Sequence, residues 1–195
     1  APESTIDTPA GPVTITEGES VAFTGTGTDP DGDLPLTYLW DFGASGAPSS
    51  TAEDPGAVTF PTAGTFTVSF TATDAKGLAD PTPATVVVTV EPPNQAPEST
   101  IDTPAGPVTI TEGESVAFTG TGSDPDGDLP LTYLWDFGAS GVAPSNAEDP
   151  GAQTFATAGT FTVSFAVTDA KGLADPTPAT VQVTVEPPNQ APESV

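Results

Sequence analysis

Three aspartates at alternate positions within five residues are the side chains of this chain best suited to chemistry. They are Asp29, Asp31 and Asp33, in the order Asp-Pro-Asp-Gly-Asp. Proline and glycine favour a tight turn, and alternate spacing in such a turn lets the three carboxylates converge. Hard oxygen donors suit Ca²⁺, which takes about six to eight oxygen ligands. An ordinary acidic turn is the alternative interpretation, because turns use the same residue types.

The acidic loop would need help from other segments to hold an ion. It lacks the glycine and the final glutamate of an EF-hand, because Leu34 and Trp40 stand at those positions. Carboxylates this close repel one another strongly without a counter-ion. The chain has almost no cationic side chain to supply one, so a bound metal ion is the expected source of positive charge.

The whole segment around this loop occurs twice. Trp40 is matched by Trp135, 95 residues later, and the two copies differ at about ten positions. Near-identical neighbours of this kind supply length, valency or stiffness more often than two separate chemistries. The expected organisation is a repeat over 1–91, a Pro-rich linker over 92–97, a second repeat over 98–186, and a linker with the start of a truncated third repeat over 187–195.

Charge and composition narrow the classes of function. The chain has 27 acidic residues against 2 basic ones, for a net charge of −25, and no cysteine. Such a surface repels nucleic acid and anionic lipid, so we expect neither nucleic-acid binding nor membrane insertion of this segment. It should instead attract divalent cations. A segment of a larger secreted, extracellular or cell-surface protein fits this composition best.

Short β-branched runs separated by turns are expected to position the acidic loops. Strands are predicted over 13–16, 20–24, 36–42, 57–60, 65–73 and 85–90. Residues in these runs alternate between apolar and polar, and no helical period is visible. The pattern predicts an all-β fold: two antiparallel β-sandwiches of the immunoglobulin-like kind, arranged end to end.

Differences between the copies predict which side chains face solvent. Val58 is replaced by Gln153, and Val87 by Gln182. A position that accepts either valine or glutamine is expected to face solvent. The core face of the last strand is therefore predicted at Val86, Val88 and Val90.

Four segments give the repeat a resemblance to the polycystic kidney disease (PKD) domain family. They are Trp40-Asp41-Phe42-Gly43, Glu53-Asp54-Pro55, Ala63-Gly64-Thr65-Phe66-Thr67-Val68 and Thr73-Asp74-Ala75-Lys76-Gly77. The repeat departs from the family pattern where Ala44-Ser45 follows the first segment and where Phe66 replaces a tyrosine. The segment Asn94-Gln95-Ala96-Pro97 and the acidic loop also resemble bacterial cadherin-like repeats.

This resemblance implies a particular set of calcium ligands. In calcium-binding PKD domains the residues before the first strand, the acidic loop and the turn aspartate meet at one end. In the second repeat the corresponding residues are Asn94, Gln95, Asp124, Asp126 and Asp169. The first repeat offers Asp29, Asp31 and Asp74, and no Asn-Gln pair precedes Ala1. Asp33 and Asp128 are either further ligands or only loop caps.

These features are consistent with two kinds of function and argue against a third. The first is a non-catalytic structural or adhesive module, a calcium-stiffened rod in a larger cell-surface protein or filament. Its partners would be neighbouring repeats, with lateral or end-to-end self-association. The alternative is a polymer- or carbohydrate-binding accessory module of a secreted hydrolase, which would display exposed aromatic rings. An enzyme is not expected, because the chain lacks the His, Cys and Arg side chains of the usual nucleophile–base pairs.

Overall fold

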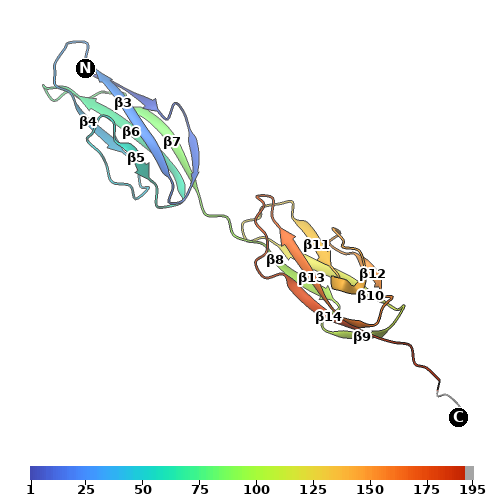
Figure 1. Cartoon of the computed structure of the whole chain (residues 1–195). Helices are drawn as coiled ribbons and strands as arrows, with labels where there is room; N and C mark the ends of the chain where they lie inside the picture. The colour runs from blue at the N-terminus through green and yellow to red at the C-terminus, as the bar shows by residue number, and fades with distance from the viewer. Residues whose placement is uncertain (192–195) are drawn as a thin grey trace. The chain divides into compact units, whose positions relative to one another are not determined.

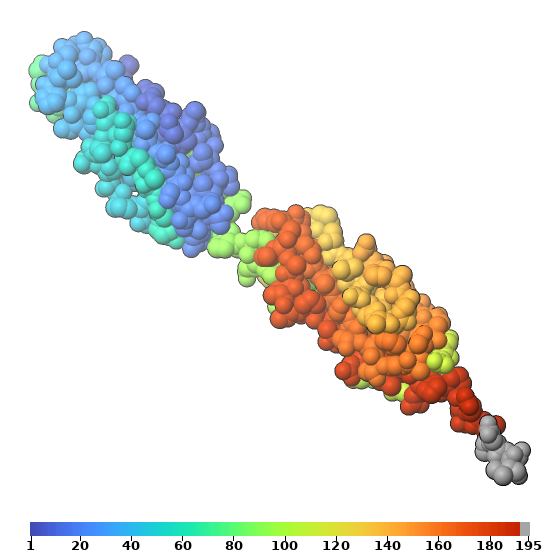
Figure 2. All heavy atoms as spheres, in the orientation of Figure 1, coloured from blue at the N-terminus to red at the C-terminus, as the bar shows by residue number. Residues whose placement is uncertain are grey.

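Two separately packed units make up the chain. The computed structural model describes residues 1–191. The units comprise Ala1–Pro93 and Asn94–Val195. In the space-filling view each unit is filled by its own residues (Figure 2). Each can therefore be described as a domain.

Seven strands form the first domain (Figure 1). They are β1 (Glu3–Thr8), β2 (Val13–Thr16), β3 (Ser20–Thr28), β4 (Thr37–Asp41), β5 (Gly56–Thr59), β6 (Gly64–Thr73) and β7 (Ala84–Glu91). One sheet has the order β1-β3-β5 and the other has the order β2-β7-β6-β4. The two sheets face each other across one hydrophobic core, so the predicted all-β sandwich is confirmed.

The second domain repeats this arrangement. Its strands are β8 (Glu98–Thr103), β9 (Val108–Thr111), β10 (Ser115–Ser123), β11 (Thr132–Asp136), β12 (Gly151–Thr154), β13 (Gly159–Thr168) and β14 (Ala179–Glu186). The sheets have the orders β12-β10-β8 and β11-β13-β14-β9. A short 3₁₀ turn, η1 (Gly138–Ser140), follows β11. No described helix is long and apolar enough to cross a membrane.

Strand β1 was not predicted from the sequence. Only Ser4 and Ile6 alternate inward in it, and Ser4 is polar, so the apolar pattern is too weak to mark a strand. The structure pairs β1 antiparallel with β3, whereas the next strand, β2, pairs in parallel with β7 in the opposite sheet. The chain thus changes sheets between Thr8 and Val13. One parallel pair is present in a sandwich that was predicted to be antiparallel throughout.

Stacked aromatic rings fill the core of each domain. Phe23, Trp40 and Phe70 are fully buried, and the ring centroids of Trp40 and Phe70 lie 4.4 Å apart. Phe70 also packs over the backbone of Gly25, where an added Cβ would lie 2.6 Å from its ring. The core thus requires a glycine at this point of β3.

The inward faces of the later strands follow the predicted alternation, with one exception. Val86, Val88 and Val90 are buried as expected. Val58, predicted to face solvent, is instead partly buried and packs against the core. Its counterpart Gln153 is also partly buried, and its Nε2 donates to the carbonyl of Pro150 at 2.9 Å. The prediction for this position was wrong because the amide of Gln153 forms a local hydrogen bond, which lets a glutamine replace valine at a partly buried position.

The two sheets bring their loops together at one end of the domain. The acidic loop connects β3 to β4, and the turn that contains Asp74 connects β6 to β7. The backbone N–H of Ala75 donates to the carbonyl of Asp33 at 3.1 Å, which joins the two loops. The same bond runs from Ala170 to Asp128 at 3.2 Å in the second domain.

Candidate metal centre

The acidic loop of the second domain is a turn built around Asp124. Oδ1 of Asp124 accepts the backbone N–H groups of Asp126 and Asp128, each at 2.9 Å. Gly127 adopts a φ of 74°, which glycine reaches without a steric penalty. One carboxylate oxygen from each of the three aspartates lies within 4.8 Å of the others. The convergence expected from the spacing is therefore present in the structure.

Asp169 approaches this loop from the neighbouring turn after β13. Its side chain is buried, and Oδ1 accepts the backbone N–H of Leu173 at 2.8 Å. Burial raises the pKa of Asp169, but hydrogen bonds from the Asn94 amide and from the turn backbone outweigh it. The net pKa lies below the ordinary value, so the carboxylate is ionised at neutral pH.

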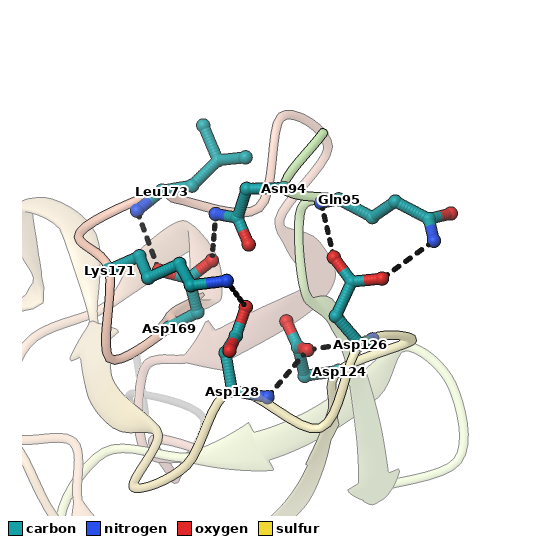
Figure 3. A network of polar contacts seen from close by, with 8 residues as sticks. All are labelled: Asn94, Gln95, Asp124, Asp126, Asp128, Asp169, Lys171 and Leu173. Atoms are coloured by element: carbon teal, nitrogen blue, oxygen red, sulfur yellow. Dashed lines mark hydrogen bonds and ion pairs between the residues drawn. The ribbon is translucent and has the colours of Figure 1, made fainter. Parts of the chain in front are cut away.

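Asn94 and Gln95 belong to the second domain and bond directly to its aspartates (Figure 3). Nδ2 of Asn94 donates to Asp169 at 2.7 Å. Gln95 donates to Asp126 twice, from its backbone N–H at 2.6 Å and from Nε2 at 2.8 Å. Here Gln95 contributes donors rather than the oxygen that a metal ligand would offer. The two residues expected in the linker are thus attached to the acidic end of the domain.

A lysine ammonium occupies one side of the cluster. Nζ of Lys171 lies 2.9 Å from Oδ2 of Asp128. From the sequence, a metal ion rather than a lysine was the expected source of positive charge beside the aspartates. The contact depends on the docking of two loops that are far apart in the sequence, so no local pattern signals it.

Three buried oxygens of the cluster accept no hydrogen bond: Oδ2 of Asp124, Oδ1 of Asn94 and Oδ2 of Asp128. The last of them lies in the ion pair with Lys171, which leaves Oδ2 of Asp124 and Oδ1 of Asn94 without a partner. The Asn94 oxygen points toward the aspartates of the loop (Figure 3). A buried polar atom without a partner is costly, and a cation would remove that cost. Carboxylate and amide oxygens are also the donors that Ca²⁺ prefers, so the residues present fit a calcium ion.

The first domain reproduces the loop but not the linker contacts. Oδ1 of Asp29 accepts the N–H groups of Asp31 and Asp33 at 2.8 and 3.2 Å. The bond from Asp33 is the main cause that lowers the pKa of Asp29. Oδ2 of Asp29 is again buried without a partner. Asp74 lies in the adjoining turn and caps it, and the amino group of Ala1 lies 3.7 Å from Asp31.

Three aspartates outside the acidic cluster have structural roles. Oδ1 of Asp41 accepts the N–H of Gly43 at 2.8 Å, which caps the loop after β4. Oδ1 of Asp54 accepts the N–H of Gly25 at 3.0 Å, and so ties a loop to β3. Asp80 is buried and accepts the Ser4 hydroxyl at 2.5 Å. This last bond anchors β1 to the loop between β6 and β7.

Each domain is therefore an immunoglobulin-like β-sandwich with a cluster of acidic side chains at one end, joined by amide groups in the second domain. Cadherin domains 3–6 of protocadherin gamma B2 share the fold, with a TM-score of 0.51 at 15% identity; the match covers 96% of this chain and 53% of that chain. At this identity the likeness concerns the fold alone.

The chain belongs to the PKD domain family. The family model, described as "PKD domain", matches twice, over residues 3–90 and 94–185. Chitinase A of Pseudoalteromonas piscicida is 32% identical over 131 residues, which is 65% of this chain and 15% of that protein. The pre-pro-metalloprotease PrtV of Vibrio cholerae is 36% identical over 83 residues, or 43% of this chain and 8% of that protein. The chain thus spans a small part of either relative.

A solved PKD domain is also similar. The PKD1 domain of Vibrio anguillarum Epp is 37% identical; the match covers 48% of this chain and all of that domain, with a TM-score of 0.37. The matching family model is not that of a catalytic domain. The resemblance to PKD domains is confirmed.

Proposed function

We propose that this chain is a non-catalytic, extracellular structural segment in which the second domain binds calcium beside the segment that joins the two domains, and the first domain binds it at the equivalent loop. The observation that carries the proposal is the pair of buried, unpartnered oxygens on Asn94 and Asp124. Asn94 and Asp169 share a hydrogen bond, so a cation here would engage both the start of the domain and its distant turn. In the second domain the ion would use Asn94, Asp124, Asp128 and Asp169, while Asp126 anchors Gln95.

Calcium bound in this way would restrict the joining segment. Strand β7 ends at Glu91, and Asn94 is already bonded to the second domain. Only Pro92 and Pro93 lie between, and proline has a fixed φ. Holding Asn94 in place would therefore leave few rotatable bonds, and an array of such domains would behave as a calcium-stiffened rod. Neighbouring repeats are its expected partners within a cell-surface protein or filament.

The alternative of carbohydrate binding lacks its expected platform. Trp40 and Trp135 are both fully buried, so their rings cannot stack on a sugar. Occurrence of a similar segment in a protein named chitinase A supports a secreted context for this chain. We infer that this segment acts as a spacer for the domains that accompany it in the whole protein.

Small-angle scattering tests the rod directly. The chain is measured with Ca²⁺ and with chelator at matched ionic strength, because a charge of −25 responds to any salt. Calcium is expected to narrow the distribution of interatomic distances at large separations. Asn94→Ala should remove that response, whereas Glu186→Gln, which removes a charge at the end of β14, should retain it. Identical curves with Ca²⁺ and chelator would contradict the proposal.

A further inference from the structure

The one lysine of each domain holds the same position against the acidic cluster. Nζ of Lys76 lies 2.8 Å from Oδ1 of Asp33, and Nζ of Lys171 lies 2.9 Å from Oδ2 of Asp128. These are the only lysines in a chain with 27 acidic residues. Each lysine therefore lies beside the cluster of three carboxylates in its own domain, although many other acidic side chains were available.

Backbone bonds hold each lysine in place. The residue before it donates its N–H to the carbonyl of the same aspartate, from Ala75 to Asp33 and from Ala170 to Asp128. Side-chain exposure of Lys171 is 51%, against 19% for Asp128, so a half-exposed ammonium meets a largely covered carboxylate. Such a lysine can leave the aspartate without disturbing the turn that carries it.

The lysine charge acts on more than one carboxylate. The pKa of Lys76 is raised mainly by Asp33, and Asp74 and Asp29 contribute to the same shift. The ammonium therefore lies in the field of the whole cluster. It supplies part of the positive charge that three converging carboxylates require.

Two further oxygens of the cluster have no hydrogen-bond partner. Oδ2 of Asp124 and Oδ1 of Asn94 are buried and unpartnered, while Lys171 lies against Asp128 (Figure 3). An ion bound to those two oxygens would draw on Asp128 as a further ligand. It would then compete with the lysine for the same carboxylate, and its charge would repel the ammonium.

We propose that Lys171, and Lys76 in the first domain, is a built-in competitor of the metal ion that sets the affinity of each centre. Without the ion the ammonium neutralises Asp128 and keeps the acidic end folded. When calcium binds, the ammonium leaves Asp128 and moves into solvent. This inference rests on the proposed function, since it assigns the regulation of that same centre.

Titration calorimetry of the whole chain with CaCl₂ tests the competition. The wild type is compared with a Lys76→Gln/Lys171→Gln variant, which removes both charges. The matched control is Lys76→Arg/Lys171→Arg, which keeps them. We expect the glutamine variant to bind calcium about fivefold more tightly, which is the upper end of the range for one exposed ion pair, because repulsion between the ion and the ammonium acts in the same direction. The arginine variant should remain within about twofold of the wild type.

Melting without calcium provides the second measurement. In chelator the glutamine variant should melt below the wild type, because the carboxylates lose their internal counter-ion. In saturating Ca²⁺ the difference should vanish. Equal calcium affinities for the wild type and the glutamine variant would overturn the inference while leaving the proposed function intact.

The remaining outcomes separate the two proposals. If the wild type binds no calcium but the glutamine variant does, the lysine is the competitor and the proposed function is wrong. If neither chain binds calcium, both proposals fail. If the glutamine variant binds more weakly than the wild type, the lysine supports the centre rather than opposing it, and the inference is wrong.

Discussion

Asp124→Asn is the substitution that separates a metal ligand from a turn cap. Oδ1 of Asp124 holds the loop by accepting two backbone N–H groups, whereas Oδ2 has no partner. Asparagine keeps an oxygen for the first role and removes the charge needed for the second. The variant should therefore affect stability in opposite directions with and without calcium.

The size of the effect follows from mass action. Extracellular calcium modules have Kd values of about 10⁻⁴ to 10⁻³ M. At 10 mM Ca²⁺ a centre of that affinity would stabilise its domain by about 1.4 to 2.7 kcal/mol. For a domain of this size each kcal/mol moves Tm by about 4 to 8 °C, so the shift should be about 6 to 22 °C. Asp124→Asn should remove most of it in the second domain.

Differential scanning calorimetry of the whole chain measures both domains at once. In 10 mM Ca²⁺ the Asp124→Asn variant should show a second transition, about half of the total enthalpy, that melts lower than in the wild type. In chelator its Tm should equal or exceed that of the wild type, because one of three repelling charges is gone. The matched variant Asp29→Asn applies the same change to the first domain, and Glu186→Gln controls for the loss of a single charge.

Two results would refute this reasoning. A wild-type Tm that is the same in Ca²⁺ and in chelator, at equal ionic strength, would remove the ligand role altogether. A variant that loses as much stability in chelator as in Ca²⁺ would show that Asp124 serves only the turn.

The sandwich itself allows two further predictions. Gly25→Ala should destabilise the first domain by about 1 to 3 kcal/mol, because the added Cβ would lie 2.6 Å from the Phe70 ring. The control Gly11→Ala has open space at Cβ and should change the free energy of urea unfolding little. Equal effects of the two substitutions would contradict the packing argument. Ser4→Ala should cost about 1.5 to 3 kcal/mol at pH 7 by removing a bond to a charged carboxylate. Burial raises the pKa of Asp80, but its bonds to Ser4 and neighbouring backbone hold it below 3.8. The stabilisation by ionised Asp80 is present above the unfolded pKa of 3.8 and is lost as pH falls through the lower folded pKa. The loss of folding free energy caused by Ser4→Ala should therefore be smaller at pH 3 than at pH 7. An undiminished loss, measured by urea unfolding at both pH values, would exclude the linkage.

Strand positions could be predicted wherever side chains alternate strongly. The run of valines at Val86, Val88 and Val90 marks a core face by its period of two, and all three are buried. Strand β1 has only Ile6 as an apolar signal, and it is held by the Ser4–Asp80 bond across 76 residues. A polar anchor of that kind leaves no periodic pattern in the sequence.

The candidate centre could be predicted in part for the same physical reason. The spacing of Asp124, Asp126 and Asp128 is local, and their convergence follows from turn geometry. The approach of Asn94 to Asp169 was an expectation from the PKD resemblance, since 75 residues separate them. The position of Lys171 was missed because it depends on a backbone bond between two loops of the folded sandwich.

The two copies form an internal comparison of what the acidic end requires. Their loops, turn aspartates and lysines are identical, and the buried oxygen of the loop's first aspartate lacks a partner in both. In the second domain a residue before the first strand also contacts the middle aspartate, because Gln95 donates to Asp126 at 2.6 and 2.8 Å. These two short, directed bonds join the start of the domain to its acidic loop. The features common to both copies therefore belong to the loop and the lysine, and Gln95 additionally fixes the start of the second domain to that loop.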